Sequence, residues 1–409
     1  MPGLTLSLAD AVLKDDYKGP LRKQINDSVK LLAQVEKNTE DITGRRAILP
    51  CHMTRNTGVG ARLEGAVLPA AGNQGTIEQI VNVRYNYGKV RLTKQTITRM
   101  ASDRGAFIRA TKLEMDGLRS DCARDVGRQV WGTSNAVLAT CGTTTASNTV
   151  QLAASTPEQV MVSFAEGLRV DIGTAGVNSV VVAADRAVSS VNITNKTFVV
   201  DGAAVTTSSV HSVFRQGTGA ITGSTGQREL TGVQSIVSNT GTLFNIDPST
   251  YFQWQSIVEA NGGVNRPISE NLVEKAAHRA ENRSGSSVSS LWAEDGVYRA
   301  AANLLQAQKR IVNTQDLKGG HKGLEFNYGG EGAPLVRDRD CPPNKIYGLS
   351  HKDLVEYVDE DWTWEDEDGS VLQRSTDSTH TFEAIFFKFH EFATTRRNAH
   401  FRIDDIEAA

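Results

Sequence analysis

The sequence predicts an α+β fold in which a long β-hairpin arm and a long helix stand beside a mixed body. Three patterns favour this fold. Residues 46–100 alternate short apolar runs with turns marked by Gly, Asn and Pro, which is typical of exposed hairpins. A helical apolar pattern follows over 103–131. Residues 167–226 are rich in Gly, Ser, Thr and Val with period-two runs, which indicates a β-rich module, because the regular valines argue against disorder.

The hairpin region has little core of its own. Its expected turns are Asn56-Thr57-Gly58, Gly65, Leu68-Pro69, Gly72-Asn73-Gln74-Gly75 and Asn86-Tyr87-Gly88. A two-stranded ribbon is marginally stable alone in water. We therefore expect its partner surface on another copy of the protein, which favours assembly over catalysis.

The helix expected over 103–131 carries one apolar stripe, and Asp103 is its expected N-cap. The stripe consists of Ile108, Met115, Leu118, Cys122, Val126 and Val130. At 1.5 Å per residue the helix would run roughly 40 Å, which is long for a globular domain.

Shorter elements are expected on both sides of this core. Pro20 opens an N-terminal helix with Leu21, Ile25, Val29 and Leu32 on one face. Helices are expected over 157–168, from a Ser269 cap to about Arg283 with Gly285 as the stop, and over 295–309. Strands are expected over 346–364 and 381–403.

The charge of the chain is nearly balanced overall but uneven along the sequence. The 409 residues carry a net charge of −3, which gives no overall signal for nucleic acid or membrane. Basic residues outnumber acidic ones over 84–128, whereas residues 353–368 are mostly acidic. These segments either pair between subunits, face different compartments or are two solvated faces.

The ends and the cysteines carry no targeting or metal signal. The N-terminus lacks a secretory pattern, and no apolar run approaches the roughly 20 residues that span a bilayer. The four cysteines stand alone, which supports neither a zinc site nor a disulfide framework.

No motif for catalysis, cofactor or metal binding stands out. Gly58–Gly65 resembles a dinucleotide loop but lacks the strand-to-helix context of a phosphate site. His380, His390 and His400 are interpreted as surface or sheet-edge residues. The acidic residues 359–361 and 365–368 are separated by a segment that contains Trp362 and Trp364. This arrangement favours a charged hairpin over a cation site. We predict no enzyme, no cofactor and no metal.

Four stretches carry a family resemblance: RNTGVGARLEGAVLPAAGNQG, KRIVNTQDLKGGHKGLEFNYGGEGAPLVRDRDCPPNKIYGLSHKDL, DWTWEDEDGSVLQR and FFKFHEFATTRRNAHFRI. Together, and in this order, they resemble the major capsid proteins of tailed bacteriophages with the Hong Kong 97 fold. The resemblance spans nearly the whole chain.

The resemblance implies a division of the chain into five parts. It gives an N-terminal arm (1–45), an extended loop (46–98), a peripheral domain (99–156) with spine helix 103–131, an axial domain (157–379) with a β-rich insertion (167–226), and a return to the peripheral domain (380–409). Trp362 and Trp364 are expected to anchor axial-domain packing, or simply to lie in a core.

Three sets of residues are candidates for structural roles. Intersubunit contacts are expected from Arg55, Arg62, Glu64, Lys89 and Lys94, because charge matching gives an exposed arm its specificity. Gly58, Gly60 and Gly65 are the expected loop hinges. Arg104, Arg109, Lys112 and Arg119 are candidates for facing packaged DNA.

The implied function is a shell of pentamers and hexamers, icosahedral or prolate, that encloses double-stranded DNA in a virion after assembly in the host cytoplasm. Implied partners are copies of the chain, a separate scaffolding protein, a portal and a decoration protein, with nonspecific DNA contact and no membrane. Lys–Asn cross-links are not predicted. The alternatives are a cellular nanocompartment shell of the same fold, a soluble cofactor-dependent enzyme using the Gly58–Gly65 loop, and a phage tail or decoration protein.

Overall fold

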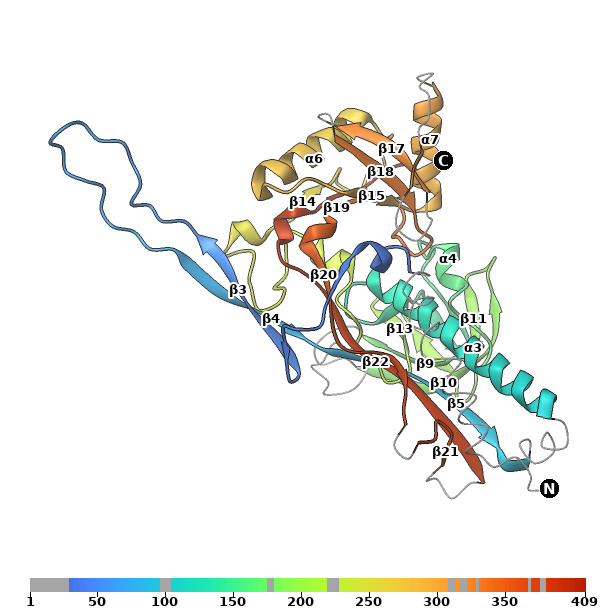
Figure 1. The fold of residues 1–409 in the computed structure, drawn as a ribbon. Helices are drawn as coiled ribbons and strands as arrows, with labels where there is room; N and C mark the ends of the chain where they lie inside the picture. Colours follow the sequence, from blue (N-terminus) through green and yellow to red (C-terminus); the bar gives the residue numbers. More distant parts are fainter. Residues whose placement is uncertain are drawn as a thin grey trace.

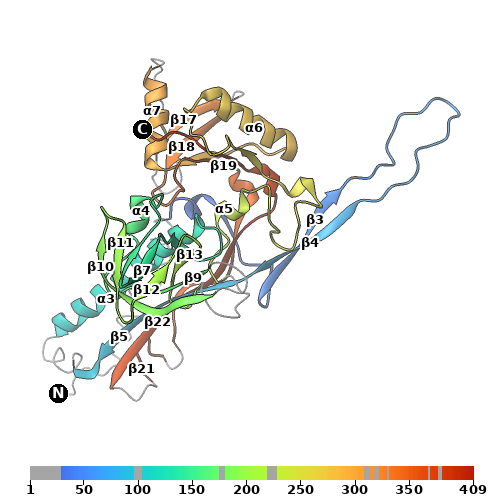
Figure 2. The same cartoon turned by 180° about the vertical axis from the view of Figure 1, so that it is seen from behind.

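In the computed structural model, a long arm projects from a body that has three parts (Figure 1). The structure describes residues 29–95, 104–174, 180–218, 228–307, 314–316, 322–328, 331–366, 369–375 and 380–409. The body consists of a long sheet with one helix across it, a β-rich module, and a second sheet with two helices (Figures 1 and 2). Short helical turns connect these parts: η1 (Leu32–Gln34), α5 (Val233–Ile236), η2 (Phe252–Trp254), η4 (His351–Asp353) and η5 (Arg397–Ala399).

The long sheet is organised around one fourteen-residue strand, β22 (Thr381–Thr394). Its neighbours are β20 (Leu354–Trp364), β21 (Gln373–Arg374) and β5 (Arg84–Thr93), while β1 (Glu36–Asn38) adds to β20 in parallel. Alternate residues of β22, including Ala384, Phe386 and Phe392, face a core shared with α3 (Arg104–Val130). The predicted long helix is therefore present and covers one face of this sheet.

Gly88 shows where helix and sheet approach most closely. The sequence pattern predicts a turn at Asn86-Tyr87-Gly88, but this prediction is wrong, because β5 runs straight through these residues in register with β22. A Cβ on Gly88 would lie 2.8 Å from Cys122 Sγ and 3.0 Å from Leu118 Cδ1 of α3. The glycine is required by helix packing and not by a turn.

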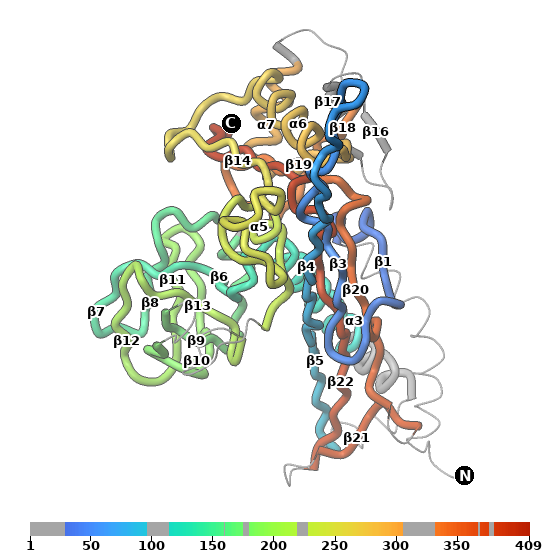
Figure 3. Tube along the Cα trace, turned by 90° about the vertical axis from the view of Figure 1, so that its left-hand side faces the viewer, coloured from blue at the N-terminus to red at the C-terminus, as the bar shows by residue number. Residues whose placement is uncertain are grey.

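The arm is a two-stranded ribbon with an open end. Strands β3 (Arg46–Thr54) and β4 (Gly75–Asn82) pair along their length, and β2 (Ile42–Thr43) adds at the base. Residues 55–74 extend beyond the last ladder pair. The β4 strand continues after Val83 into β5, so the arm and the long sheet share one ribbon (Figure 3).

The β-rich module is a closed antiparallel barrel with its own core. Gly142 N–H donates to Gln151 O at 2.7 Å and Ala153 N–H to Thr140 O at 2.9 Å, which joins the first strand to the last. Its strands are β6 (Val137–Thr140), β13 (His211–Arg215), β9 (Arg169–Thr174), β10 (Val181–Asn192), β11 (Thr197–Val200) and β8 (Thr149–Gln151), with the pair β7 (Thr144–Ser147) and β12 (Val205–Thr207) beside them. The module thus begins near Val137, ahead of the predicted 167–226. The helix expected over 157–168 is only α4 (Glu158–Met161).

The two connections of the barrel to the body run side by side. A Cβ on Gly232 would lie 2.2 Å from Gly132 O, so the two backbones touch. Ser134 Oγ donates to Ser235 Oγ at 3.1 Å across the same junction. This close approach is typical of a module inserted into an existing fold.

A second sheet forms the upper part of the body in Figure 1. Its strand order is β14 (Ile257–Glu259), β23 (Phe401–Ile403), β19 (Ile346–Leu349), β15 (Ser290–Ala293), β18 (Glu331–Arg337), β17 (Lys322–Tyr328) and β16 (Thr314–Asp316). Helices α6 (Glu270–Ser284) and α7 (Asp295–Ala307) pack against it. The predicted cap and stop of α6 are confirmed: Ser269 Oγ accepts from Leu272 N–H at 3.3 Å, and Gly285 has φ +70°.

The predicted domain boundaries cut across this architecture. Strand β22 lies in the long sheet but β23 lies in the second sheet, so residues 380–409 contribute to both. Strands β20 and β21 share the long sheet with β5, although the predicted axial range includes them. The peripheral and axial assignments stay predictions. Leu21 and Ile25 of the expected N-terminal helix lie outside the described residues, whereas Val29 and Leu32 are buried in the core that includes Met115.

Substituting Gly88 tests the helix–sheet contact. Gly88→Ala places a methyl group against Cys122 and Leu118, and overpacking of this kind costs about 1–3 kcal/mol. Gly117→Ala is the matched control, because a Cβ there meets nothing within 4 Å and alanine favours the helix by about 1 kcal/mol. Denaturant unfolding of the unassembled protein measures both. A Gly88→Ala protein as stable as the control would contradict this packing.

Candidate assembly surfaces

The tip of the arm carries apolar side chains that the described part of the chain leaves exposed. Val59, Leu63, Val67 and Leu68 are 84%, 86%, 88% and 78% exposed. Clustered exposed apolar side chains are unfavourable in water and mark contact sites. The residues predicted to make contacts on the arm were charged and did not include these four, although their proximity in the sequence was the available signal.

Glycines shape the tip. At its neck the two limbs touch, since a Cβ on Gly58 would lie 2.7 Å from Ala70 O. At its end Ala66 N–H donates to Leu63 O at 3.1 Å, and Gly65 takes φ +75°, a left-handed conformation that favours glycine. A Cβ on Gly60 would lie 3.2 Å from the Arg62 guanidinium. The hinge role of Gly58, Gly60 and Gly65 stays a prediction.

The charged arm candidates differ in their surroundings. Arg62 is used within the tip, where Nε donates to Val67 O and Nη1 to Ala61 O, each at 3.1 Å. Arg55 and Glu64 are exposed, and within the described part of the chain neither forms an ion pair. Their intersubunit role stays a prediction.

Lys89 and Lys94 lie away from the arm, on the long sheet. Lys89 Nζ lies 2.5 Å from Glu383 Oε2, and Arg91 reaches the other oxygen of Glu383 at 2.5 Å. Lys94 lies over the Phe382 ring, 5.5 Å from its centroid. Each therefore has a contact within its own chain, and a role between subunits stays a prediction.

The candidate DNA-facing residues lie on α3. The side chains of Arg104, Arg109 and Lys112 are outside the described part of the structure. Arg119 is half-buried and pairs with Asp116 at 3.3 Å. It lines a small basic groove with Lys30, Arg124, Arg337 and Arg339, although Asp116, Asp338 and Asp340 line it as well.

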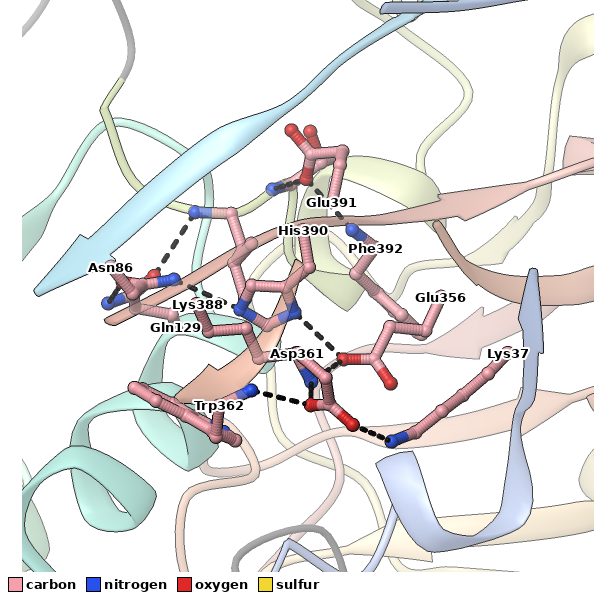
Figure 4. A network of polar contacts seen from close by, with 12 residues as sticks. Lys37, Asn86, Gln129, Glu356, Asp361, Trp362, Lys388, His390, Glu391 and Phe392 are labelled. Atoms are coloured by element: carbon pink, nitrogen blue, oxygen red, sulfur yellow. Dashed lines mark hydrogen bonds and ion pairs between the residues drawn. The ribbon is translucent and has the colours of Figure 1, made fainter. Parts of the chain in front are cut away.

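A buried polar network lies beneath the long sheet (Figure 4). Lys388 and Glu356 are fully buried, and Lys388 Nζ donates to Glu356 Oε1 at 2.6 Å. His390 Nδ1 lies 2.8 Å from the same oxygen, and Lys388 also lies 3.4 Å from Asp361. Asp361 extends the network to Lys37 of β1 at 3.4 Å. The network thus ties the N-terminal strand to the centre of the sheet.

The network continues through β5 into the long helix. Asn86 lies 3.0 Å from His390 Nε2, and Gln129 Nε2 donates to Asn86 Oδ1 at 3.0 Å and to Asp125 Oδ2 at 2.9 Å. Asp125 pairs with Arg215 of the barrel at 2.9 Å. One chain of polar contacts therefore joins N-terminal strand, sheet, helix and barrel.

The other face of β22 holds a second buried carboxylate. Glu391 accepts from Thr231 N–H at 2.7 Å, from Phe392 N–H at 3.0 Å and from Arg84 Nε at 3.0 Å. Burial raises the pKa of Glu391 to about 7, although Arg84 and the two N–H groups oppose the shift.

Burial also controls the charge of the other network groups. Burial, and then Lys388, lowers the pKa of His390 to about 4, so the ring is neutral at pH 7. We assign its proton to Nδ1, which faces Glu356, and Asn86 Nδ2 then donates to Nε2. Burial alone would raise the pKa of Glu356, but Lys388 and His390 hold it well below its usual range. The buried pair is therefore ionised beside a neutral histidine.

The interpretation of two histidines as surface residues is wrong. His390 and His400 are fully buried, whereas His380 is exposed. Burial lowers the pKa of His400 to about 4, and its ring lies between Ser350 N–H and Thr394 Oγ1, at 3.2 and 2.9 Å. The missed signal was the spacing of two: Lys388 and His390 fall on the same face of β22 as Phe386 and Phe392.

The tryptophan pair lies in the core of the long sheet. The Trp362 ring stacks on Phe386 with centroids 4.8 Å apart, and Trp364 lies 4.8 Å from the same ring. Asp359 and Glu360 stay exposed on this strand.

Among the described residues, no group of three or more His, Cys, Asp or Glu side chains is placed to hold a metal ion. None of the described helices is long and apolar enough to cross a membrane.

Comparison with solved structures identifies the fold. A capsid protein of cyanophage A-1(L) superimposes with a TM-score of 0.54 over 93% of both chains, at 12% identity. The chain has the Hong Kong 97-type capsid fold. Two other solved structures match less well. The capsid of an empty GTA particle gives a TM-score of 0.48 at 10% identity, over 93% of this chain and 90% of that chain. The SrpI encapsulin of Synechococcus elongatus PCC 7942 gives a TM-score of 0.44 at 9% identity, over 99% of this chain and 97% of that chain.

Sequence comparison finds no matching family model and no matching curated protein. The resemblance drawn from the four sequence stretches is thus confirmed at the level of the Hong Kong 97-type fold, although the identity to the cyanophage protein is low.

Removing one partner of the buried pair tests the network. Lys388→Met leaves Glu356 with a buried charge and only the neutral His390 as a close donor, and such losses cost about 3–5 kcal/mol. Adding Glu356→Gln removes that charge and should recover part of the loss. Chemical denaturation of the unassembled protein measures the three variants. If the double variant is less stable than Lys388→Met alone, the buried pair does not act as described.

The buried histidines make stability depend on acid. Both have a lower pKa in the folded chain than in the unfolded chain, so unfolding takes up protons as the pH falls from 6.5 to about 4. Stability should be constant above pH 7 and fall by about 3 kcal/mol per histidine across this window. Glu391, whose pKa is raised, acts in the opposite sense between pH 4.5 and 7.

Unfolding midpoints at pH 7.5, 6.5, 5.5 and 4.5 measure this dependence. His390→Gln cannot take up a proton at this position and should show a smaller acid loss than the wild type. An unchanged pH dependence in that variant would show that His390 is not held neutral.

Proposed function

We propose that this chain is a major capsid protein that self-assembles into the pentamers and hexamers of a phage head, icosahedral or prolate, enclosing double-stranded DNA. The uncovered apolar tip of the arm carries the proposal. A ribbon that ends in four exposed apolar side chains gains stability only when a surface outside its own chain covers them.

The geometry favours a head-to-tail contact between copies. The arm projects from one side of the body, far from its own core (Figure 1). A contact between unlike surfaces repeats from copy to copy, and it closes into a ring when the rotation permits. The protein is a structural component in this proposal and not an enzyme.

The further partners follow from the same role. A scaffolding protein, a portal and a decoration protein complete such a head, with assembly in the host cytoplasm and the mature protein in the virion. DNA is held nonspecifically through its phosphates, with Arg119 and the other basic residues of α3 as contacts. The weakly acidic chain suits a lining that must release its genome.

The arm tip provides the test. Leu63→Ser, Val67→Ser and Leu68→Ser together should abolish shells yet leave the unfolding midpoint unchanged, because these side chains are almost fully exposed. The matched control is Val180→Ser, Ile193→Ser and Val210→Ser on the barrel, where the side chains are 60%, 43% and 68% exposed. Sedimentation and electron microscopy of the purified proteins provide the measurement.

Three results would count against the proposal. A wild-type protein that stays monomeric at every concentration and salt condition would exclude self-assembly, and tip variants that form normal shells would exclude the arm. Small, uniform shells without a portal vertex or DNA would favour a nanocompartment.

A further inference from the structure

A basic groove lies beside the outer half of the β3–β4 ribbon, next to the start of the open tip. It has a volume of about 1320 Å³ and is formed by β3 and the residues after it, η2, the end of α6, and the segments around 352 and 396. Its exposed cations are Arg55, Arg283, Lys352 and Arg396, while Asp353 is its one carboxylate among the described lining residues. The groove therefore has an excess of positive charge.

These cations are poorly neutralised within their own chain. Arg55, Arg283 and Lys352 form no ion pair with any described residue. Arg396 lies 3.7 Å from Asp353, a buried residue that also accepts from Ser350 Oγ at 2.8 Å. Four exposed cations around one shared carboxylate favour an anionic occupant.

The same chain carries an acidic edge with the opposite imbalance. Strand β1 pairs Asn38 with Tyr357 of β20, two residues before Asp359. Asn38 Oδ1 then accepts from the backbone N–H groups of Glu40 and Asp41, so a turn holds these two residues close to the Asn38–Tyr357 pair. The carboxylates of Glu40, Asp41, Asp359 and Glu360 are exposed. Asp41 accepts from Asn38 Nδ2, and none of the four forms an ion pair in the described part of the chain. Asp361, by contrast, is already paired with Lys37 and Lys388.

The two surfaces are too far apart to neutralise each other within one molecule. Ile42, next to Asp41, pairs with Ala47, and Arg55 lies eight residues further along the same ribbon. At about 3.3 Å per residue this is roughly 25 Å. The Debye length is only about 8–10 Å at physiological salt, so the charges are screened from each other inside one copy. In Figure 3, β1 lies at the right-hand margin of the described trace.

We propose that the acidic edge of one copy (Glu40, Asp41, Asp359 and Glu360) docks in the basic groove of another copy (Arg55, Arg283, Lys352 and Arg396). The inference rests on the proposed function, since it names the surfaces through which copies meet. Exposed ion pairs are individually weak, but the contact recurs throughout a shell and fixes which surface meets which. Assembly should therefore weaken with added salt.

Charge reversal with rescue tests the proposal. Arg283→Glu with Lys352→Glu reverses two of the four groove cations, and Asp359→Lys with Glu360→Lys reverses two of the four edge carboxylates. Each pair should abolish shells at 0.1 M salt, while the protein with all four substitutions, in which the substituted residues of the two surfaces again have opposite signs, should recover them in part. Glu158→Lys with Glu166→Lys, on an exposed part of the barrel, is the matched control for the edge pair, because it makes the same charge change. Circular dichroism and unfolding midpoints confirm that each variant is folded.

The outcomes separate this inference from the proposed function. Wild-type shells together with normal assembly of either reversed pair overturn the docking and leave the capsid role intact. Loss with the groove variant but not with the edge variant also overturns it, because the occupant is then another polyanion. Failure of the fourfold variant to recover shells, when it is folded, counts against this pairing. A wild-type protein that never assembles overturns both.

Discussion

The buried ion pair between Lys388 and Glu356 constrains the whole long sheet. Both side chains are fully buried, and separating either from the other leaves an unpaired charge in the core. The pair forms only when β20 and β22 keep their register, in which Val358 lies opposite His390. A slip by one residue would move Lys388 and His390 to the opposite face of the sheet and Phe387 and Phe389 into the core. The pair therefore favours one register of β20 and β22 over the alternatives, in addition to any stability that it contributes.

The positions of the arm and of α3 depend on this register, because both are attached to the long sheet through β5. Strand β5 pairs with β22 over ten residues and continues through Val83 into β4 of the arm. Helix α3 packs on β5 at Gly88, and Gln129 of α3 donates to Asn86 of β5. Because arm, helix and sheet share contacts, the arm leaves the body from a fixed origin. Its tip needs no core of its own, and we propose that its contacts lie on other copies.

The polar network connects parts that are otherwise separate packing units. The barrel has its own core, and its two connections to the body meet at Gly132 and Gly232. Arg215 of the barrel pairs with Asp125 of α3, and Glu391 accepts from Thr231 just after the barrel. The N-terminal strand joins through Lys37.

Local signals in the sequence by themselves determined the arm, the long helix, the β-rich character of the module and the cap and stop of α6. Turn residues, helical spacing, Ser269 and Gly285 act within a few residues and depend little on distant partners. The tertiary structure decided that Gly88 serves a helix contact and not a turn, that the module closes as a barrel from Val137, and that Lys388 and His390 are buried. It also showed the exposed apolar tip and the two unbalanced charged surfaces. Apart from the tip, whose apolar residues are close in sequence, these features depend on residues far apart in the chain. Whether such a side chain is buried or exposed is fixed only when those residues meet.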